Sequence, residues 1–282
     1  MPRPDFVVCG HAVRDIVPGG WRLGGTVTFA AVQAHRLGLS VGVVTRAGAD
    51  LDVSAELPFA DVVQEPSPES TSFENHYVRG ERKQRVLSRA APIGIGDVPE
   101  AWRASAVILV GPVFREIDPA FASALDDAAL VGVSPQGWLR ALDGDGNVTR
   151  IAYEGEPFWR GADAIFVSDE DLLGGRGDAT PWLEGEAVVT MTESHLGAQV
   201  WSEGRWRRIG AFPEDEVDPT GAGDTFAAAF LIRLHETGDA AASVRFGAAA
   251  ASLSIGGIGA AAIPRRDEIE ARMSEYPEVT LR

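Results

Sequence analysis

The chain has 282 residues, of which 45% are hydrophobic, so it can bury one large core or a main domain with a small appendage. Its 41 acidic and 25 basic residues give a net charge of -16, which repels nucleic acids and anionic membranes, and no concentrated basic stripe offsets this charge. Neither a signal peptide nor an apolar run of membrane-spanning length is visible. We therefore expect a cytoplasmic protein that acts on neither nucleic acid nor a membrane.

Two rare residue types exclude further classes of protein. Lys83 is the only lysine, and its surroundings lack the glycine loop of a Walker A phosphate site, which excludes a P-loop NTPase. A pyridoxal-phosphate enzyme would need the same lysine, which stands in a highly charged stretch and is not favoured for that role. Cys9 is the only cysteine, so an intramolecular disulfide and a multi-cysteine zinc site are excluded.

Short apolar runs, each closed by a turn-favouring residue, predict the strands of the chain. Their continuous hydrophobicity is typical of a parallel sheet that is covered on both faces. The runs are residues 6–9, 41–44, 107–110, 130–133, 164–167 and 187–189. Between several of them, apolar residues at helical spacing predict helices over 27–37, 226–234 and 244–255, and Gly38 and Gly238 stand as stop signals after the first two.

Residues 72–88 have a different pattern, polar throughout and broken by a turn at Gly80. This pattern predicts a β-hairpin, and residues 65–69 before it resemble a linker. We expect the hairpin to stand outside the main sheet as a small β lid, with an ordinary hairpin at the edge of the main sheet as the alternative. No repeat or interdomain linker is visible, so we expect residues 1–282 to form one domain that carries this lid.

The segment 218–226 contains the most informative motif. Small residues at Gly221, Ala222 and Gly223 allow a sharp turn that gathers backbone N–H groups at the start of the predicted helix 226–234, which makes an anion hole. Asp224 beside this turn would repel phosphate unless it handles a proton, as a general base does in phosphoryl transfer. The alternative is an ordinary acidic residue at a helix N-terminus.

Asp218-Pro-Thr-Gly-Ala-Gly-Asp224 resembles the C-terminal signature of the ribokinase-like (PfkB) carbohydrate kinases. The resemblance covers nearly the whole chain, because Gly24-Gly25 before a predicted helix is similar to the N-terminal signature. It implies an α/β, three-layer fold, with a mainly parallel central sheet between helices and a small β lid. It also implies an enzyme that uses ATP and Mg²⁺, with Asp224 as catalytic base and the 221–223 turn as anion hole.

Acceptor binding is assigned from the same resemblance. Asp15 matches the acidic residue that holds substrate hydroxyl groups, with a turn aspartate as the alternative, and Gly24 and Gly25 match glycines that lie close to the sugar, with a plain helix-entry turn as the alternative. Asn75 on the expected lid and Gln136 after the fourth predicted strand are polar candidates for reading the acceptor, and surface hydrogen bonding is the equal alternative.

The donor residues also follow from the resemblance. Thr192 and Gly197 match a loop beside the ATP phosphates and ribose, although Thr192 stands where the family usually has glycine and the loop is longer. Ala248 and Gly259 match the adenine side. Asp171 matches a carboxylate that supports Mg²⁺, whereas Ser168 replaces the asparagine of that motif, and a capped helix start explains both residues equally well.

Two sequence features bear on the substrate and on competing functions. Phe29 occupies a position where ribokinases place an asparagine that contacts the sugar, which makes ribose a weaker candidate and points to the inositol-kinase-like branch. Residues 257–262 match the letters of a dinucleotide-binding fingerprint, but a helical pattern precedes them instead of the strand that the fingerprint requires. This argues against a Rossmann dehydrogenase.

We therefore predict transfer of the γ-phosphate of ATP to a hydroxyl group of a sugar, an inositol-like polyol or a nucleoside. The alternative is a catalytically impaired regulatory protein that binds a nucleotide or metabolite on the same fold. We also expect a homodimer through the lid, because a small hairpin leaves exposed strand edges.

Overall fold

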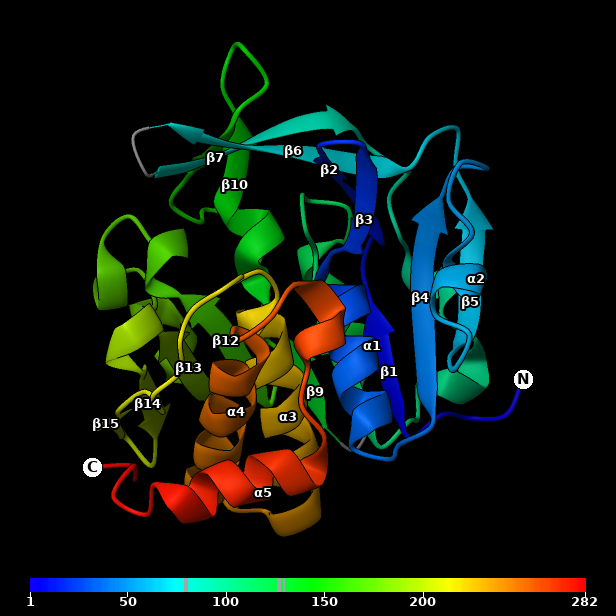
Figure 1. Ribbon diagram of the computed structural model, residues 1–282. Helices are drawn as coiled ribbons and strands as arrows, with labels where there is room; N and C mark the ends of the chain where they lie inside the picture. Colours follow the sequence, from blue (N-terminus) through cyan, green and yellow to red (C-terminus); the bar gives the residue numbers. More distant parts are fainter. Residues whose placement is uncertain (79–80, 126–127, 129) are drawn as a thin grey trace.

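A computed structural model describes residues 1–78, 81–125, 128 and 130–282. Its largest element is a nine-stranded sheet in the order β15-β14-β13-β12-β9-β8-β1-β4-β5 (Figure 1). The strands from β13 to β5 run parallel, and β14 and β15 extend the sheet in antiparallel fashion. The bounds are β1 Phe6–Cys9, β4 Val41–Ala47, β5 Asp61–Pro66, β8 Val107–Val110, β9 Val131–Val133, β12 Ala164–Ser168, β13 Val188–Thr192, β14 Ala198–Ser202 and β15 Arg205–Ile209.

The parallel part of the sheet is the part that the sequence predicts. All six apolar runs form its strands, and residues of β1 and β8 are fully buried because layers cover both faces. The strands that the pattern misses, β5, β14 and β15, lie toward the two edges, where polar or charged residues interrupt the apolar ones. Glu65 and Pro66 end β5, so the interpretation of these two residues as linker was wrong.

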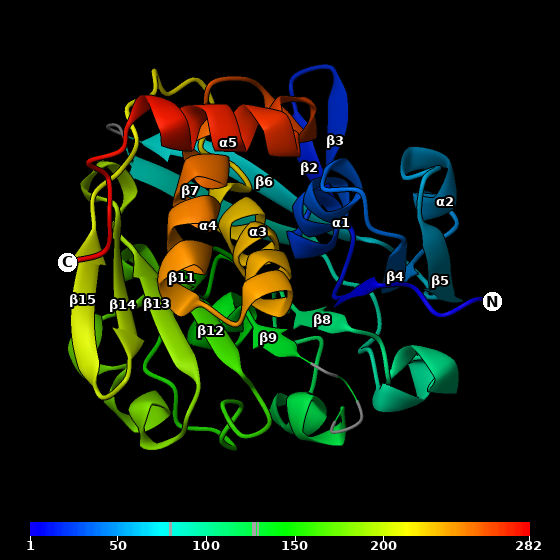
Figure 2. The ribbon, with the colours of Figure 1, turned by 90° about the horizontal axis from the view of Figure 1, so that it is seen from below.

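Three α-helices cover one face of the sheet: α1 Thr26–Arg36, α3 Ala222–Thr237 and α4 Ala240–Ser254 (Figures 1 and 2). A fourth, α5 Arg266–Glu275, packs across α4 (Figure 2). Gly238 ends α3 in a left-handed conformation, as its sequence position predicts. The sequence pattern misses α5, because Ile269 is its only buried residue. A one-turn helix, α2, spans Val53–Glu56.

Short 3₁₀ helices and loops cover the opposite face. They enclose a second core whose largest members are Trp102, Trp182 and Phe158. The expected three layers are therefore present, although 3₁₀ turns form the third layer in place of α-helices. The 3₁₀ helices are η1 Ile95–Asp97, η2 Glu100–Trp102, η3 Pro119–Ala124, η4 Pro135–Leu139, η5 Asp169–Asp171, η6 Gly175–Gly177, η7 Thr180–Glu184, η8 Ser194–Leu196 and η9 Gly259–Ala262.

A separate four-stranded sheet stands beyond the end of the main sheet (Figure 1). It has the order β3-β2-β6-β7, with β2 Val13–Val17, β3 Gly20–Gly24, β6 Thr71–Val78 and β7 Glu81–Ser88. The predicted hairpin is β6–β7, and it does not belong to the edge of the main sheet; its turn at Gly80 lies outside the described residues. The β2–β3 hairpin is not predicted by the sequence pattern.

The small sheet has its own minor core, formed by Val13, Phe73, Val113 and Phe114. A short ribbon of β10 Arg140–Leu142 and β11 Val148–Arg150 lies beside it, and Asn147 bridges to Arg85 of β7. In the described part of the chain, no helix has the length and apolar character needed to cross a membrane.

Candidate active site

The N-terminus of α3 carries the Gly-Ala-Gly turn. Gly221 is the N-cap, with φ of 81°, and within the described residues no side chain caps this end of the helix. Thr225 N donates to Gly221 O at 2.9 Å, so the regular hydrogen bonding of the helix begins there. The N–H groups of the first turn lack partners inside the helix. Ala222 N donates to Pro219 O at 3.2 Å, just before the helix, and Gly223 is exposed. The turn therefore presents backbone N–H groups and the positive end of a helix dipole to solvent.

Phe29 supports this turn from beneath. Its side chain is buried, and its ring occupies the space that a Cβ atom at Gly221 would need. Together with the positive φ, this contact explains why position 221 requires glycine. Phe29 of α1 thus packs against the anion-hole turn. The phenyl ring has a structural role at the position where ribokinases place an asparagine that contacts the sugar.

Asp224 lies in the first turn of α3 and is half-buried. Burial raises the pKa of its carboxyl group to about 6, an effect opposed by a hydrogen bond from Thr26 and by the charge of Arg140, whereas the charge of Asp171 adds to it. These groups come from α1, β10 and η5, so segments far apart in the sequence meet at this carboxyl group. A carboxyl group with this pKa is suited to exchange a proton near neutral pH.

Asp171 and Gln136 form a pair beside Asp224. The amide of Gln136 donates to Asp171 Oδ1 at 3.0 Å. Ser168 Oγ accepts from Glu170 N at 3.2 Å, and Asp171 Oδ2 accepts from Ser168 N at 3.4 Å, so the capped start expected as the alternative is also present. Among the described residues, no group of three or more histidine, cysteine, aspartate or glutamate side chains converges to hold a metal. The Asp171 carboxylate still fits an Mg²⁺ ion that takes its remaining oxygen ligands from phosphates and water.

The small sheet contributes a second set of residues. Asp15 of β2 lies with its carboxylate directly against Gly24, where any Cβ atom would overlap it. Gly25 follows as the N-cap of α1. Asn75 of β6 pairs in register with Gln84 of β7, two residues along from the Phe73–Val86 pair. The structure thus places Asp15, Gly24 and Gly25 together at the base of the small sheet, whereas Gln136 lies with Asp171.

Three loops surround the expected donor side, beginning with the loop after β13. Thr192 is the last residue of β13, where its conformation does not call for glycine. The residue with left-handed backbone is Ser194, with φ of 49°. Gly197, with φ of 95°, closes the loop and packs against the backbone of residues 209–211.

Asp218 connects the other two loops. Its Oδ1 accepts from Thr220 N at 3.0 Å and its Oδ2 accepts from Gly259 N at 3.3 Å. Its own N–H donates to Ile255 O, at the end of α4, on which Ala248 is partly exposed. The anion-hole turn, Gly259 and the end of α4 are therefore held as one unit.

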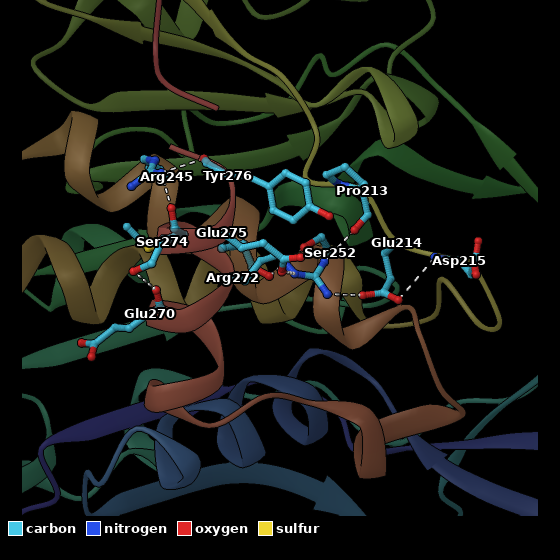
Figure 3. A network of polar contacts seen from close by, with 12 residues as sticks. Pro213, Glu214, Asp215, Arg245, Ser252, Glu270, Arg272, Ser274, Glu275 and Tyr276 are labelled. Carbon is cyan, nitrogen blue, oxygen red and sulfur yellow. Dashed lines mark hydrogen bonds and ion pairs between the residues drawn. The ribbon is translucent and has the colours of Figure 1, made fainter. Parts of the chain in front are cut away.

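Helix α5 holds the chain that leads into this unit. Figure 3 shows Arg272 of α5 donating to Pro213 O at 2.6 Å and to the Glu214 carboxylate at 2.7 Å. Arg245 of α4 donates to Tyr276 O at 3.0 Å, which secures the end of α5 (Figure 3). The segment before Asp218 is thereby anchored to two helices.

Thr26 and Arg140 are site residues that sequence reasoning did not identify. Thr26 directly follows Gly24-Gly25, and Arg140 stands four residues after Gln136, one turn further along the chain. Their closeness in the sequence to Gly25 and Gln136 was the only feature that could have identified them. Both act on the Asp224 carboxyl group, which only the folded chain reveals.

Sequence comparison with known proteins finds relatives that share the segment around the anion-hole turn. The family model described as pfkB family carbohydrate kinase matches residues 166–266, which include the anion-hole turn and Asp224. Inositol 3-kinase of Oryza sativa subsp. japonica is 27% identical over 277 residues, covering 88% of this chain and 68% of the relative. Ribokinase of Bacillus subtilis is 42% identical over 89 residues, 31% of this chain and 30% of the relative.

Solved structures share the fold over nearly the full chain. A pyrophosphate-dependent myo-inositol-1 kinase, converted into a myo-inositol-3 kinase by mutation, superposes with a TM-score of 0.78 at 23% identity, covering 96% of this chain and 99% of the other. A fructokinase with bound ATP from Xylella fastidiosa has a TM-score of 0.72 at 18% identity, covering 97% and 99%. The chain is thus similar to the pfkB family of carbohydrate kinases over residues 166–266 and to inositol 3-kinase over most of its length.

Proposed function

We propose that the protein transfers the γ-phosphate of ATP to a hydroxyl group of an inositol-like polyol, with a sugar or a nucleoside as further acceptor classes. The observation that carries this proposal is the Asp224 carboxyl group, whose pKa is raised to about 6 beside an uncapped helix N-terminus. At pH 7 about nine-tenths of such groups are ionised and ready to accept a proton. The alternative of an impaired regulatory protein has no comparable support, because it requires neither the base nor the anion hole.

Asp224 would act as the general base in this reaction. The acceptor oxygen forms a bond to the γ-phosphorus while the bond from that phosphorus to the β,γ-bridging oxygen breaks, and the hydroxyl proton passes to Asp224. The N–H groups of the 221–223 turn receive the negative charge of the transferring group, and the Arg140 guanidinium adds positive charge near the same carboxyl group. Mg²⁺, held through Asp171, would neutralise phosphate charge.

Three exposed apolar residues support ATP as the donor. Leu196, Val217 and Ile258 have exposed fractions of 52%, 58% and 55%, and each lies on one of the three loops of the donor side. Together with Ala248 and Gly259 they offer an apolar surface for a nucleobase, which pyrophosphate would not use. Thr192 and Gly197 then lie beside the ribose and phosphates.

The small sheet would bind the acceptor. Asp15 accepts hydrogen bonds from acceptor hydroxyl groups, Gly24 and Gly25 allow the ring to lie close to the backbone, and Asn75 reads the acceptor from β6. Similarity to the inositol 3-kinase of rice favours an inositol-like ring. The sheet would act as a lid that closes over the acceptor and excludes water.

A homodimer through this sheet stays a prediction. Strand β3 is one edge of the small sheet, and β7 at the other edge is bridged by Asn147. Pairing of two molecules would therefore use β3, whose backbone groups face outward along its free side.

Replacement of Asp224 tests the proposal. We expect D224N to lower kcat by about 10³-fold, because a positioned base contributes roughly 10²- to 10⁴-fold, while the Kd for ATP changes little. A coupled ADP assay with a panel of polyols, sugars and nucleosides gives kcat, and calorimetry gives the Kd. D215N, which changes an exposed aspartate of the preceding loop, is the matched control. Turnover by D224N within threefold of the parent would refute the mechanism.

A further inference from the structure

A charged cavity lies on the face of the main sheet opposite α3 and α4, apart from the candidate active site. It measures about 620 Å³, a volume within the usual range for small-molecule sites. Four arginines and two carboxylates line it, so the lining has an excess of two positive charges in a chain whose net charge is -16. This concentration of arginine distinguishes the cavity from the acidic surface of the chain as a whole.

The placement of its side chains follows from the strand pairing. Gln199 of β14 lies opposite Met191 of β13 and Arg208 of β15, so the three side chains form one row across the sheet. Met191 belongs to the core beneath the 3₁₀ helices, which places this row on their side of the sheet. Trp206, two residues before Arg208, lies on the same face.

Arg176 of η6 completes the cavity from above. Its guanidinium lies over the Trp206 ring at 5.5 Å and donates to Gln199 Oε1 at 2.6 Å. Arg208 forms an ion pair with Glu193 and keeps half of its side chain exposed. Two guanidinium groups thus border one cavity with an aromatic ring between them, a combination that binds phosphate groups well because arginine forms paired hydrogen bonds with their oxygens.

We propose that this cavity binds a phosphate group, either free or on a small ester, and that its occupation regulates the donor loop. The connection is Glu193, the first residue of the loop 193–197. Its carboxylate accepts from Arg208 and Gln199, and its N–H donates to Gly197 O at 2.8 Å. A phosphate that draws Arg208 away from Glu193 removes one of the two side-chain contacts of Glu193 and leaves the loop less firmly held. The regulatory part of the proposal rests on the proposed function, whereas the binding part does not.

Calorimetry with inorganic phosphate and with AMP tests the binding. We expect R176A to raise the Kd at least tenfold and the charge reversal R176E to abolish binding. R205A removes an exposed arginine of β15, the strand that carries Trp206 and Arg208, but Arg205 does not line the cavity. Its Kd should stay within twofold of the parent. Equal affinity for both ligands identifies the free oxyanion as sufficient, and tighter binding of AMP identifies an ester. Binding that is absent, or equal in R176A and R205A, overturns the proposal.

Steady-state kinetics test the regulation separately. Inorganic phosphate should raise the KM for the donor severalfold in the parent and in R205A, with kcat unchanged, and should have no such effect in R176A. Phosphate that binds in calorimetry without changing this KM overturns the link through Glu193. A protein that shows the R176A-sensitive binding but no turnover would refute the proposed function while leaving the phosphate site intact.

Discussion

The two halves of the active site are built in contrasting ways. The Asp224 half begins on α3, whose Phe226 and Phe230 are buried in the large core between the helices and the main sheet. The Asp15 half stands on the small sheet, whose core contains four buried residues in the described part of the chain. A large core fixes geometry closely, whereas a minor one allows a sheet to move as a unit. Under the proposed function, catalysis would take place on the rigid half and acceptor binding on the half that can close.

Each half nevertheless contains one glycine that a neighbouring side chain makes necessary. Gly221 meets the ring of Phe29, and Gly24 meets the carboxylate of Asp15. If the contrast between the halves is correct, an added methyl group should damage catalysis and stability in the first case and acceptor binding in the second.

G221A should have the largest effect. The added Cβ meets the Phe29 ring at a residue whose φ is 81°, so the turn must shift. We expect the free energy of unfolding to fall by about 2 to 4 kcal/mol, from left-handed strain and overpacking. Displaced N–H groups should lower kcat about 10²-fold. Denaturant unfolding and the ADP assay measure the two effects.

The matched control for stability is G223A. A Cβ atom at Gly223 meets no atom within 4 Å, and its φ is not positive. G223A should therefore unfold within about 1 kcal/mol of the parent, as alanine is a good helix former. Equal destabilisation by both variants would show that Phe29 does not constrain the turn.

G24A should have a smaller effect, confined to the acceptor. The methyl group displaces the Asp15 carboxylate, so we expect the KM for the acceptor to rise by about tenfold, equivalent to one lost charged hydrogen bond, with the KM for ATP unchanged. G20A is the control, because a Cβ atom there, on the same strand β3, meets nothing within 4 Å. A rise in both KM values for G24A would mean that the two halves are not separate.

The same contrast decides what the sequence predicts. The sequence predicts the elements of the rigid half well. Its buried strands have continuous apolar runs, and Gly221 to Asp224 form one uninterrupted motif at the start of a helix. The small sheet is predicted only in part, because β2 and β3 are short strands with few apolar residues, and the turn signal of Pro18-Gly19 between them was not used. Asp15 was therefore expected in a turn or beside the substrate, but not within a strand.

Contacts between distant segments are what the sequence could not supply. Arg140 and Thr26 belong to β10 and α1, and no spacing rule connects either with Asp224. Phe29 was considered only as the replacement of a sugar-contacting asparagine, whereas its position beneath Gly221 depends on how α1 packs on α3. Position 192 was compared with the family pattern, which gave no sign of the left-handed backbone at Ser194 in the same loop.

T26V should have the smallest effect and tests the contact between α1 and the catalytic carboxyl group. A base must be ionised to act, so kcat/KM should fall as the pH drops below about 6, the pKa of Asp224. The Thr26 hydrogen bond stabilises the carboxylate and lowers this pKa, so its loss should move the acid limb of the pH profile to higher pH. T225V is the control, since the Thr225 hydroxyl is buried and has no hydrogen-bond partner among the described residues. An acid limb that stays in place in T26V, or one that persists unchanged in the residual activity of D224N, would assign the limb to a group other than Asp224.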